Sequence, residues 1–544
     1  MLQYKKGLVY YEQLFLSLEV IGGGNVSFLT TLKNMIWKGG AKLGMTKSLT
    51  KITDDERVAI AESEYNRIQE AKKYYRDDLP VVWYRNSYGQ RRRRKMNTLN
   101  ITKLAAKRLA SIIFNEQCEI SLKDTAHNDL LNQIIDDNHF NLQFEQHLET
   151  GVALGGLAAR PYVDDQNNIR IAWANADQFY PLHSNTDNIS ECVFASRSVK
   201  TENKQLVYYT LLEFHQWLDA DTYQITNELY RSTERDVVGQ SVPLNTLYPK
   251  MQPTITFNNG TIKKPLFAYF RTPGANNKDL DSPLGMGIVD NSKNIINAIN
   301  ATHDEFFHEI KMGKRRIAVP AEMLRPGNKF GNTANDDETH PLMFDPDMDV
   351  YEQFYGDADN MSITDLTSDI RTQQYKEAID YFLREFEEQT GFSAGTFSFD
   401  GQSVKTATEI VSENSTTYQT RSSYLTQVEL FLNQLVTAIL EVASTPEFFT
   451  DSQARCNFNA DDDLGLNVHF DDGVFVDKDK QQANDLALVA AGIMPKQQFL
   501  VRNEGLSDEE AQQWLKQVLQ EQPEMSGNAG EETRGPDDED MGAE

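Results

Sequence analysis

The sequence predicts an α+β protein in which a β-rich region is followed by unusually long helices. Between residues 157 and 230, short runs of β-branched and aromatic residues alternate with Asp and Asn turns, as in an antiparallel meander. Between residues 282 and 445, apolar residues recur at helical spacing over spans well above the ~11–12-residue mean helix. With 544 residues the chain exceeds one compact core, so two to four domains are expected.

The part before the meander is predicted to be mostly helical. Thr53-Asp54-Asp55-Glu56 has the spacing of a capping box and predicts a helix that runs to about Tyr75. Further helices are expected at about 98–114 and within 127–154. The core-facing side chains expected on the first two helices are Ile60, Tyr65, Ile68 and Ala71, then Leu104, Ala105, Leu109, Ile112 and Ile113.

Two apolar stripes flank a short insert in the middle of the chain. The first stripe predicts one narrow face of a long helix and comprises Ile288, Ile295, Ile299, Phe306 and Ile310. Basic residues between 311 and 316 suit the C-terminal end of that helix. A stretch rich in Gly, Pro, Asn and Asp follows, from Ile317 to about residue 360. The second stripe predicts a helix over 363–390 that ends at Gly391, and comprises Ile363, Leu366, Ile370, Ala378, Phe382 and Phe386.

A third helical pattern is the longest in the chain. One heptad series runs from Val404 to Ile439 and a second from Ala407 to Val442, which predicts a helix about 57 Å long. Its N-terminal half is rich in Ser and Thr, so only a narrow seam is expected to be buried in that half. Such a helix favours packing against neighbouring subunits, although an ordinary bundle helix remains the alternative. Shorter helices are predicted at about 478–491 and 507–521, after a strand at 467–470.

Composition argues against several classes of function. The net charge of −28, from 53 basic and 81 acidic residues, disfavours tight, sequence-specific binding of DNA. Cys118, Cys192 and Cys456 lie far apart and predict isolated thiols rather than a disulfide framework or a zinc site. No run of 18 apolar residues predicts a membrane span. Neither a metal nor a cofactor is expected.

Two motifs leave alternatives open. Gly391-Phe392-Ser393-Ala394-Gly395 fits the G-x-S-x-G elbow, but that motif needs a preceding strand, and here a helix precedes it. His469 is the only downstream histidine, so a hydrolase built on Ser393 is a minor alternative to a mobile loop, and no enzyme is expected. The basic run from Arg91 to Lys95 has three equal interpretations: contact with phosphate, pairing with acidic neighbours in an assembly, or simple solvation.

The central block resembles a known family. Asp281-Ser282-Pro283-Leu284-Gly285 enters a long helix that ends in basic residues, and residues 365–390 lead to Gly391-Phe392-Ser393-Ala394-Gly395-Thr396-Phe397-Ser398-Phe399-Asp400-Gly401 and then Lys405-Thr406-Ala407-Thr408-Glu409-Ile410. This layout resembles the portal proteins of tailed bacteriophages, in particular the group from siphophages and prophages of Gram-positive hosts. The resemblance covers about residues 50–520 and is most specific in the centre.

The resemblance implies a portal fold with named parts. These are an N-terminal arm (1–50), a mixed wing (51–281), a first stem helix (282–313), a small α/β clip (314–362), a second stem helix (363–390), a tunnel loop (391–403), a long helix of the wing and tunnel (404–445), a helical crown (446–522) and a disordered acidic tail (523–544). In the arm, Ile21-Gly22-Gly23-Gly24-Asn25-Val26 fits a translated ribosome-binding site before an alternative start at Val26. The first 25 residues are therefore, by hypothesis, not translated.

The resemblance also implies partners and a site. Portal proteins form a ring, typically a dodecamer, at one capsid vertex, through which double-stranded DNA is packaged and ejected. The implied partners are further copies of the chain, the terminase large subunit, the major capsid and scaffold proteins, a head-completion adaptor and DNA bound without sequence preference. The implied location is the virion, with the host cytoplasm during assembly. The loop residues expected to face DNA are Phe397, Phe399, Asp400, Gln402 and Lys405. The alternative is an acidic head-assembly adaptor or scaffold partner without a channel.

Overall fold

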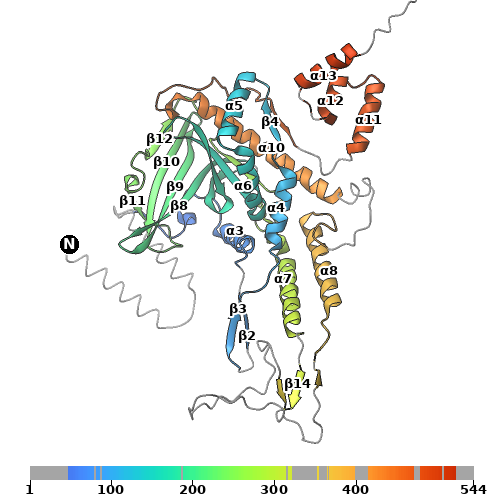
Figure 1. Ribbon diagram of the computed structural model, residues 1–544. Helices are drawn as coiled ribbons and strands as arrows, with labels where there is room; N and C mark the ends of the chain where they lie inside the picture. Colours follow the sequence, from blue (N-terminus) through green and yellow to red (C-terminus); the bar gives the residue numbers. More distant parts are fainter. Residues whose placement is uncertain are drawn as a thin grey trace, which may run out of the picture. The chain divides into compact units, whose positions relative to one another are not determined.

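The described residues form two compact units. The computed structural model (Figure 1) describes residues 47–78, 81–85, 89–184, 188–313, 317–320, 352–354, 364–365, 367–398, 415–470, 478–504, 506 and 508–521. Within this part of the chain, the first unit holds everything up to residue 470 and the second holds residues 478–521. Most of the predicted arm and tail, including the start-codon hypothesis at Val26, lie outside the described residues.

A seven-stranded sheet is the largest element of the first unit. Its strands are β1 (Ser48–Leu49), β7 (Phe179–Ser184), β8 (Ile189–Glu202), β9 (Gln205–Asp219), β10 (Thr222–Ser232), β11 (Gly239–Val242) and β12 (Thr254–Phe257). The order is β1-β11-β10-β9-β8-β7, and β12 also pairs with β10. The predicted antiparallel meander is confirmed in β7 to β10. Strand β1 shows that the end of the predicted arm already belongs to this sheet.

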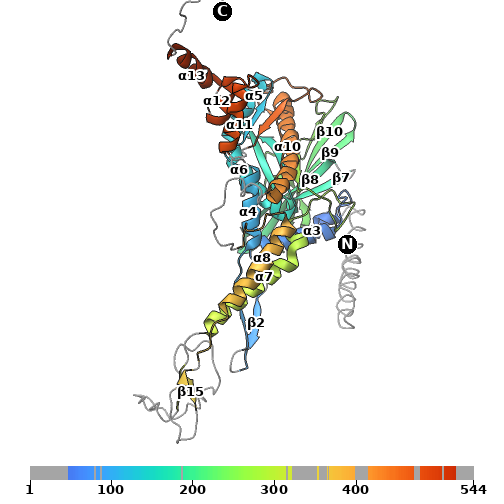
Figure 2. The same ribbon diagram turned by 90° about the vertical axis from the view of Figure 1, so that its right-hand side faces the viewer.

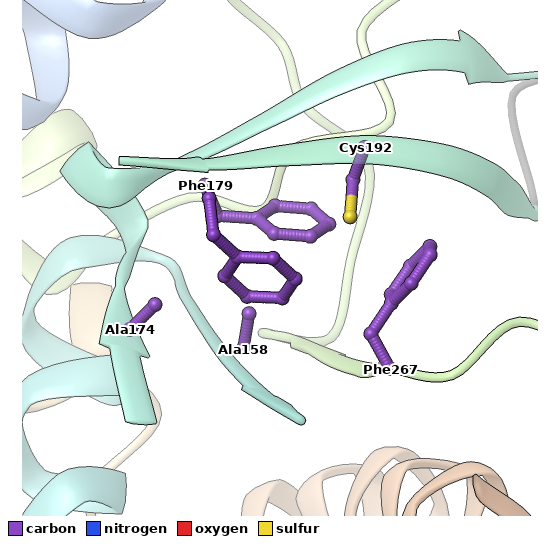
Figure 3. Close-up of a cluster of buried hydrophobic side chains, with 6 residues drawn as sticks. Ala158, Ala174, Phe179, Cys192 and Phe267 are labelled. Atoms are coloured by element: carbon purple, nitrogen blue, oxygen red, sulfur yellow. The ribbon is translucent and has the colours of Figure 1, made fainter. Parts of the chain in front are cut away.

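The start of the predicted meander forms a separate sheet. Strands β5 (Gly156–Val163) and β6 (Ile169–Asn175) pair with each other and with β13 (Ala268–Arg271). A short 3-10 turn, Ala176–Gln178, separates β6 from β7. Buried side chains from both sheets meet in one cluster, in which Ala158 and Ala174 face Phe179, Cys192 and Phe267 (Figure 3). Apolar burial between the two sheets therefore holds the β-rich region together.

The predicted start of the first helix is wrong. Helix α3 (Glu62–Tyr75) begins eight residues after the short 3-10 turn Ile52–Asp54. Thr53, the expected N-cap, lies within that turn, and the nearby Asp55 carboxylate is buried and pairs with Arg57 and Lys47, which both also pair with Glu228 on β10. Ion pairing with the large sheet thus overrides the local capping signal. The apolar stripe of Tyr65, Ile68 and Ala71 is buried as predicted.

Three more helices precede the meander. Helix α4 (Ile101–Ile113) buries its predicted stripe except Leu104, which is exposed. The predicted helical region 127–154 is divided into α5 (Thr125–Asp137) and α6 (Phe140–Leu154). His139 takes a left-handed conformation at this break, and the Asn138 amide donates to the carbonyls of Ile134 and Ile169. Strand β4 (Glu119–Leu122) lies between α4 and α5.

Helices α7 (Ile288–Met312) and α8 (Thr372–Thr390) run side by side in opposite directions (Figures 1 and 2). The rings of Phe306 and Tyr375 stack 5.3 Å apart, and Arg371 pairs with Glu309. The prediction that the second helix begins at residue 363 is wrong. Thr364–Asp365 form strand β16, which pairs with β14 (Ile317–Pro320), and β14 also pairs with β15 (Glu352–Phe354). A small sheet therefore separates the two helices along the chain, while Ile363 and Leu366 lie outside the described residues.

Helix α10 (Ser415–Ser444) confirms the prediction of a narrow buried seam in its Ser/Thr-rich N-terminal half, where Thr417, Arg421 and Val428 share one face. Its C-terminal half is more extensively buried, against β5, β13 and α4, although Leu430, Asn433 and Gln434 are exposed. Phe431, for example, stacks on Phe144 of α6 at 5.3 Å. Length and composition alone would allow α10 to cross a membrane, but a core helix passes the same test, and most of its most apolar window is buried. Residues 404–414 of the predicted helix lie outside the described part.

The end of the chain divides between the two units. Strand β17 (Leu466–His469) is confirmed near its predicted place, but it pairs with β4 of the first unit. The described boundary therefore falls after residue 470, rather than at residue 446 where the crown was predicted to begin. The second unit contains α11 (Lys478–Ala490), α12 (Lys496–Glu504) and α13 (Asp508–Glu521), of which α12 was not predicted.

Candidate functional site

The candidate site is the junction at which α8 ends, the chain turns, and α10 follows. Gly391 ends α8 in a left-handed conformation, with φ +76°, as predicted for a C′ glycine. Its carbonyl accepts a hydrogen bond from the Thr420 hydroxyl of α10 at 2.8 Å. An added Cβ at Gly391 would lie 2.4 Å from that hydroxyl, so the turn requires glycine for space as well as for φ. The end of α8 is thus fixed directly to α10.

A buried carboxylate holds the first part of the loop. Glu387 is fully buried, and its two carboxylate oxygens accept hydrogen bonds from the backbone N–H groups of Gly395, Phe397 and Ser398. The Ser398 hydroxyl also donates to it, at 3.2 Å. Four donors converge on one carboxylate, which satisfies a group that would otherwise be costly to bury. Residues 391–398 are therefore folded back against α8.

Glu387 was missed in the sequence. It belongs to the apolar face of α8 with Ile379, Leu383 and Phe386, where a charged side chain is unexpected. An acidic residue on an apolar stripe, one turn before a Gly-rich loop, is the signal that points to it.

Ser393 plays a structural part in this junction. Its side chain is buried, its backbone N–H donates to the Thr417 hydroxyl at 2.8 Å, and its own hydroxyl oxygen accepts from the Thr417 backbone N–H at 3.1 Å. A helix precedes it, so the strand-to-helix elbow of a hydrolase is absent at this position. The pair of Ser393 and Thr417 instead ties the loop to the start of the described part of α10.

Of the five residues predicted to face DNA, only Phe397 is described. It is half-buried, and its ring lies edge-on to Phe392 at 5.0 Å and to Phe386 at 6.0 Å. Phe399, Asp400, Gln402 and Lys405 lie outside the described residues. The structure thus describes the anchored base of the loop.

A buried polar network holds the start of α7, the first of the two paired helices. Glu64 of α3 accepts hydrogen bonds from the side chains of Asn276 and Ser282, at 2.7 and 3.1 Å, and pairs with Arg67. Arg67 also pairs with Asp290 in the first turn of α7 and donates to the Gly285 carbonyl. Burial raises the pKa of Asp290, although Arg67 opposes this effect. The Ser282-Pro283-Leu284-Gly285 segment is therefore positioned by α3.

The same segment crosses the end of α6 at very short range. Gly155 has φ +94°, and a Cβ on it would lie 2.4 Å from the Gly285 carbonyl oxygen. A Cβ on Gly285 would in turn lie 2.2 Å from the Gly155 carbonyl oxygen. Two glycines therefore let the backbone entering α7 touch the backbone leaving α6.

The basic run forms the second strand of a hairpin. Strands β2 (Val82–Arg85) and β3 (Arg91–Arg94) pair with each other. Arg94 makes two hydrogen bonds to the Asp304 carboxylate on α7, at 2.5 and 2.7 Å, and Lys95 pairs with Asp77. Two of the five basic residues thus have intramolecular acidic partners, while Arg91, Arg92 and Arg93 are exposed.

Metal and thiol chemistry have no support in the described part of the chain. There, no group of three or more His, Cys, Asp or Glu side chains is placed to hold a metal ion. Cys118 and Cys192 are buried and Cys456 is half-buried, all three as free thiols. Burial raises the pKa of the Cys456 thiol to about 11, which disfavours the reactive thiolate.

Comparison with known families decides the class of this protein. Residues 55–524 match the family described as phage portal protein, SPP1 Gp6-like. The chain belongs to this portal family. A portal protein is a structural subunit of the ring through which DNA is packaged at the capsid vertex, and it is a component of the virion. The alternative of an adaptor without a channel is not favoured.

Two further comparisons add little. A solved structure described as the neck of a native GTA particle, computed with C12 symmetry, shares 11% identity with the chain at a TM-score of 0.38. The match covers 75% of this chain and 89% of that one. No curated protein matches the chain.

Proposed function

We propose that twelve copies of the chain form the portal ring, with α7 and α8 as its stem. Large apolar side chains on these helices stay exposed in a single copy: Phe307 and Ile310 on α7, Ile370 just before α8, and Tyr381 on α8, which is 64% exposed. Exposed apolar surface on paired helices favours association with further copies. This surface is the observation that supports the stem assignment.

The remaining parts follow the same assignment. The α+β region of residues 51–281 is the wing, and the segment 314–362, which includes β14 and β15, is the clip. The clip is the proposed contact for the terminase large subunit and, later, for the head-completion adaptor. Residues 446–522 were predicted as the crown, and within them we propose α11 to α13 for this part. Assembly takes place in the host cytoplasm, with the major capsid and scaffold proteins.

The loop that follows α8 is the proposed contact with DNA. Glu387, Ser393 and Thr417 anchor its base, so the described part of the loop is held to both α8 and α10. Phe397, Phe399, Asp400, Gln402 and Lys405 remain the residues proposed for the channel. The net charge of −28 suits a wall past which DNA slides, because acidic surface repels phosphate.

Shortening the loop tests this function. Deletion of residues 394–401 is expected to leave rings with an axial hole visible in negative-stain microscopy, while DNA filling of heads falls. The Gly260→Ala change, in a distant turn where an added Cβ would meet only the Asp221 carboxylate at 3.8 Å, is the control for handling and expression. Wild-type protein that forms no ring contradicts the portal assembly, and normal filling of heads by the shortened variant contradicts the role of the loop.

A further inference from the structure

The β2–β3 hairpin presents two unlike faces. In this antiparallel pair, Val82 lies opposite Arg94 and Trp83 opposite Arg93. Because side chains alternate along a strand, Arg94 and Trp83 point to opposite faces. The face with Arg94 is held to α7 through Asp304, which is buried and also accepts a hydrogen bond from the Asn97 backbone N–H. The hairpin therefore stands beside α7 (Figures 1 and 2).

The opposite face is basic, aromatic and exposed. We define the hairpin face as Trp83, Arg85, Arg91 and Arg93, all of which are exposed. Trp83 is 52% exposed, and the Arg91 guanidinium lies 4.4 Å from the centre of its ring. Within the described part of the chain, these three arginines have no acidic partner. An isolated two-stranded hairpin is marginally stable in water, and Trp and Arg dominate the energetic centres of protein interfaces.

Helix α8 offers a complementary surface. We define the outer face of α8 as Glu377, Tyr381, Glu385 and Glu388, which fall within about 80° of one another at ~100° per residue. The buried residues Ile379, Leu383 and Phe386 lie on the opposite side of the helix. Arg384 also lies on this side, but it pairs with Asp380. The outer face of α8 thus combines three carboxylates with an exposed tyrosine ring.

The base of the hairpin and the first residues of the outer face of α8 lie at one level of the stem. Arg94 fixes the hairpin at Asp304 of α7, and Phe306, two residues further on, stacks on Tyr375 near the start of α8. Glu377 is two residues beyond Tyr375, and Tyr381 follows one helical turn later. In a ring whose axis runs along α7 and α8, as in the proposed stem, rotation keeps this level and changes only the subunit. The base of the hairpin of one copy, with Trp83 and Arg93, then stands at the height of Glu377 and Tyr381 on the next.

We propose that the β2–β3 hairpin is an intersubunit arm, whose hairpin face docks on the outer face of α8 in a neighbouring copy. Arginine binds carboxylate through strong, charge-assisted hydrogen bonds, as Arg94 and Asp304 do within one copy. Double-stranded DNA also offers anions to arginine, but its backbone leaves Trp83 without an aromatic or apolar partner. The exposed Tyr381 ring on the outer face of α8 offers Trp83 an aromatic partner, which favours protein over DNA. This inference rests on the proposed ring.

Charge reversal and its rescue test the arm. The double variant Arg91→Glu, Arg93→Glu is expected to weaken ring assembly, because like charges then meet across the interface. The protein concentration needed for rings to form is expected to rise at least about tenfold. Glu377→Lys, Tyr381→Lys is expected to do the same. The combination of all four changes is expected to restore rings, as measured by analytical ultracentrifugation and negative-stain microscopy. Circular dichroism is expected to stay unchanged, since all four side chains are exposed.

A matched control and a crosslink sharpen the result. Lys200→Glu, Arg235→Glu gives the same change in net charge at exposed positions far along the chain and is expected to leave assembly unchanged. In a Cys456→Ser background, the double variant Arg93→Cys, Glu377→Cys is expected to form a series of disulfide-linked oligomers. Neither single variant, Arg93→Cys or Glu377→Cys, is expected to form this series.

Three outcomes overturn the inference. If wild-type rings form but neither double variant weakens them, the hairpin does not act as an intersubunit arm. The proposed portal ring is not contradicted by that result. If the reversal at Arg91 and Arg93 leaves rings intact but reduces retention of double-stranded DNA, the hairpin meets phosphate instead. If the four-fold variant fails to recover while each double variant weakens assembly, the two faces do not meet each other. Absence of rings in the wild-type protein contradicts the proposed function itself.

Discussion

At the scale of single residues, the molecule depends on buried acidic groups with many donors. Glu387 binds the loop after α8, Glu64 binds the segment before α7, and Glu441 binds the backbone beside the end of α10. A carboxylate that accepts several backbone or side-chain hydrogen bonds fixes an irregular segment that lacks the regular backbone hydrogen bonds of a helix or sheet. Each of these residues acts on a segment next to a long helix, so a single substitution is expected to loosen one defined place.

Glu387→Ala is expected to release the base of the loop. Three backbone N–H groups lose their shared acceptor while they remain shielded from water, which costs about 3 kcal/mol of the free energy of unfolding. The amide protons of Gly395, Phe397 and Ser398 are expected to exchange much faster with solvent. Hydrogen exchange with mass spectrometry and thermal unfolding measure both effects. Glu388→Ala, at the exposed neighbouring position, is the control, and equal behaviour of the two variants would contradict the anchoring role.

Glu441 is expected to make stability depend on pH. Burial raises the pKa of its carboxyl to about 7, although the backbone N–H groups of Lys263 and Lys264 donate to it and lower the value. The folded state therefore holds a proton that the unfolded state releases near pH 4.5. Stability from this group is present below that pH and falls as the pH rises through 7, by about 2 kcal/mol.

Glu441→Gln separates this effect from other titrating groups. A glutamine keeps an acceptor oxygen for the two backbone donors and carries no charge at any pH. Between pH 5 and pH 8 the free energy of unfolding of the wild-type protein is expected to fall relative to that of the variant, as chemical denaturation at each pH measures. Parallel pH profiles of the two proteins would rule the assignment out.

At the scale of elements, close backbone contact decides how the long helices leave the β-rich region. The end of α6 and the approach to α7 touch at Gly155 and Gly285, and the network of Glu64 and Arg67 clamps the same approach from α3. The direction of α7 is thus set by two elements, α3 and α6, that lie more than 100 residues earlier in the chain. Helix α8 follows α7 through apolar stacking and the pair of Arg371 and Glu309.

Gly155→Ala tests this crossing, and Gly274→Ala is its matched control. Both glycines have φ near +95°, so both substitutions carry the same backbone strain. Only Gly155 is crowded, since nothing lies within 4 Å of an added Cβ at Gly274. Gly155→Ala is expected to lower the free energy of unfolding by about 2–3 kcal/mol more than Gly274→Ala. Equal losses in urea denaturation would show that the crossing tolerates an extra atom.

At the scale of the whole molecule, the first unit closes its own core and leaves the stem helices partly open. Its core contains both sheets, α6 and the C-terminal half of α10, which the chain covers by itself. Large apolar groups stay exposed on the paired helices and on the hairpin beside them, among them Phe307 and Ile310 on α7, Tyr381 on α8 and Trp83 on the hairpin. Association of copies is expected through this part of the molecule.

Removal of residues 472–544 tests whether the first unit is independent. Strand β17, the last element of that unit, ends at His469 and is already paired with β4. The shortened chain is expected to keep the main thermal transition of the full chain within a few degrees, because the buried residues of the first unit stay in place. Differential scanning calorimetry measures the transition. A shortened chain that is unfolded at room temperature would show that α11 to α13 complete the core.

The sequence by itself determined what depends on local periodicity. The meander, α4, α7 and the end of α8 at Gly391 all follow from the spacing of apolar and turn residues along the chain, and the family followed from the resemblance of the central block. Tertiary structure decided everything that depends on distant partners. Asp55 pairs with Arg57 and Lys47 beside a predicted helix start that does not form, Thr364 joins β14 instead of a helix, and the C-terminal half of α10 packs against β5, β13 and α4. Glu387 and Glu64 likewise acquire their roles only in the fold, because a carboxylate is buried only where donors from elsewhere converge on it.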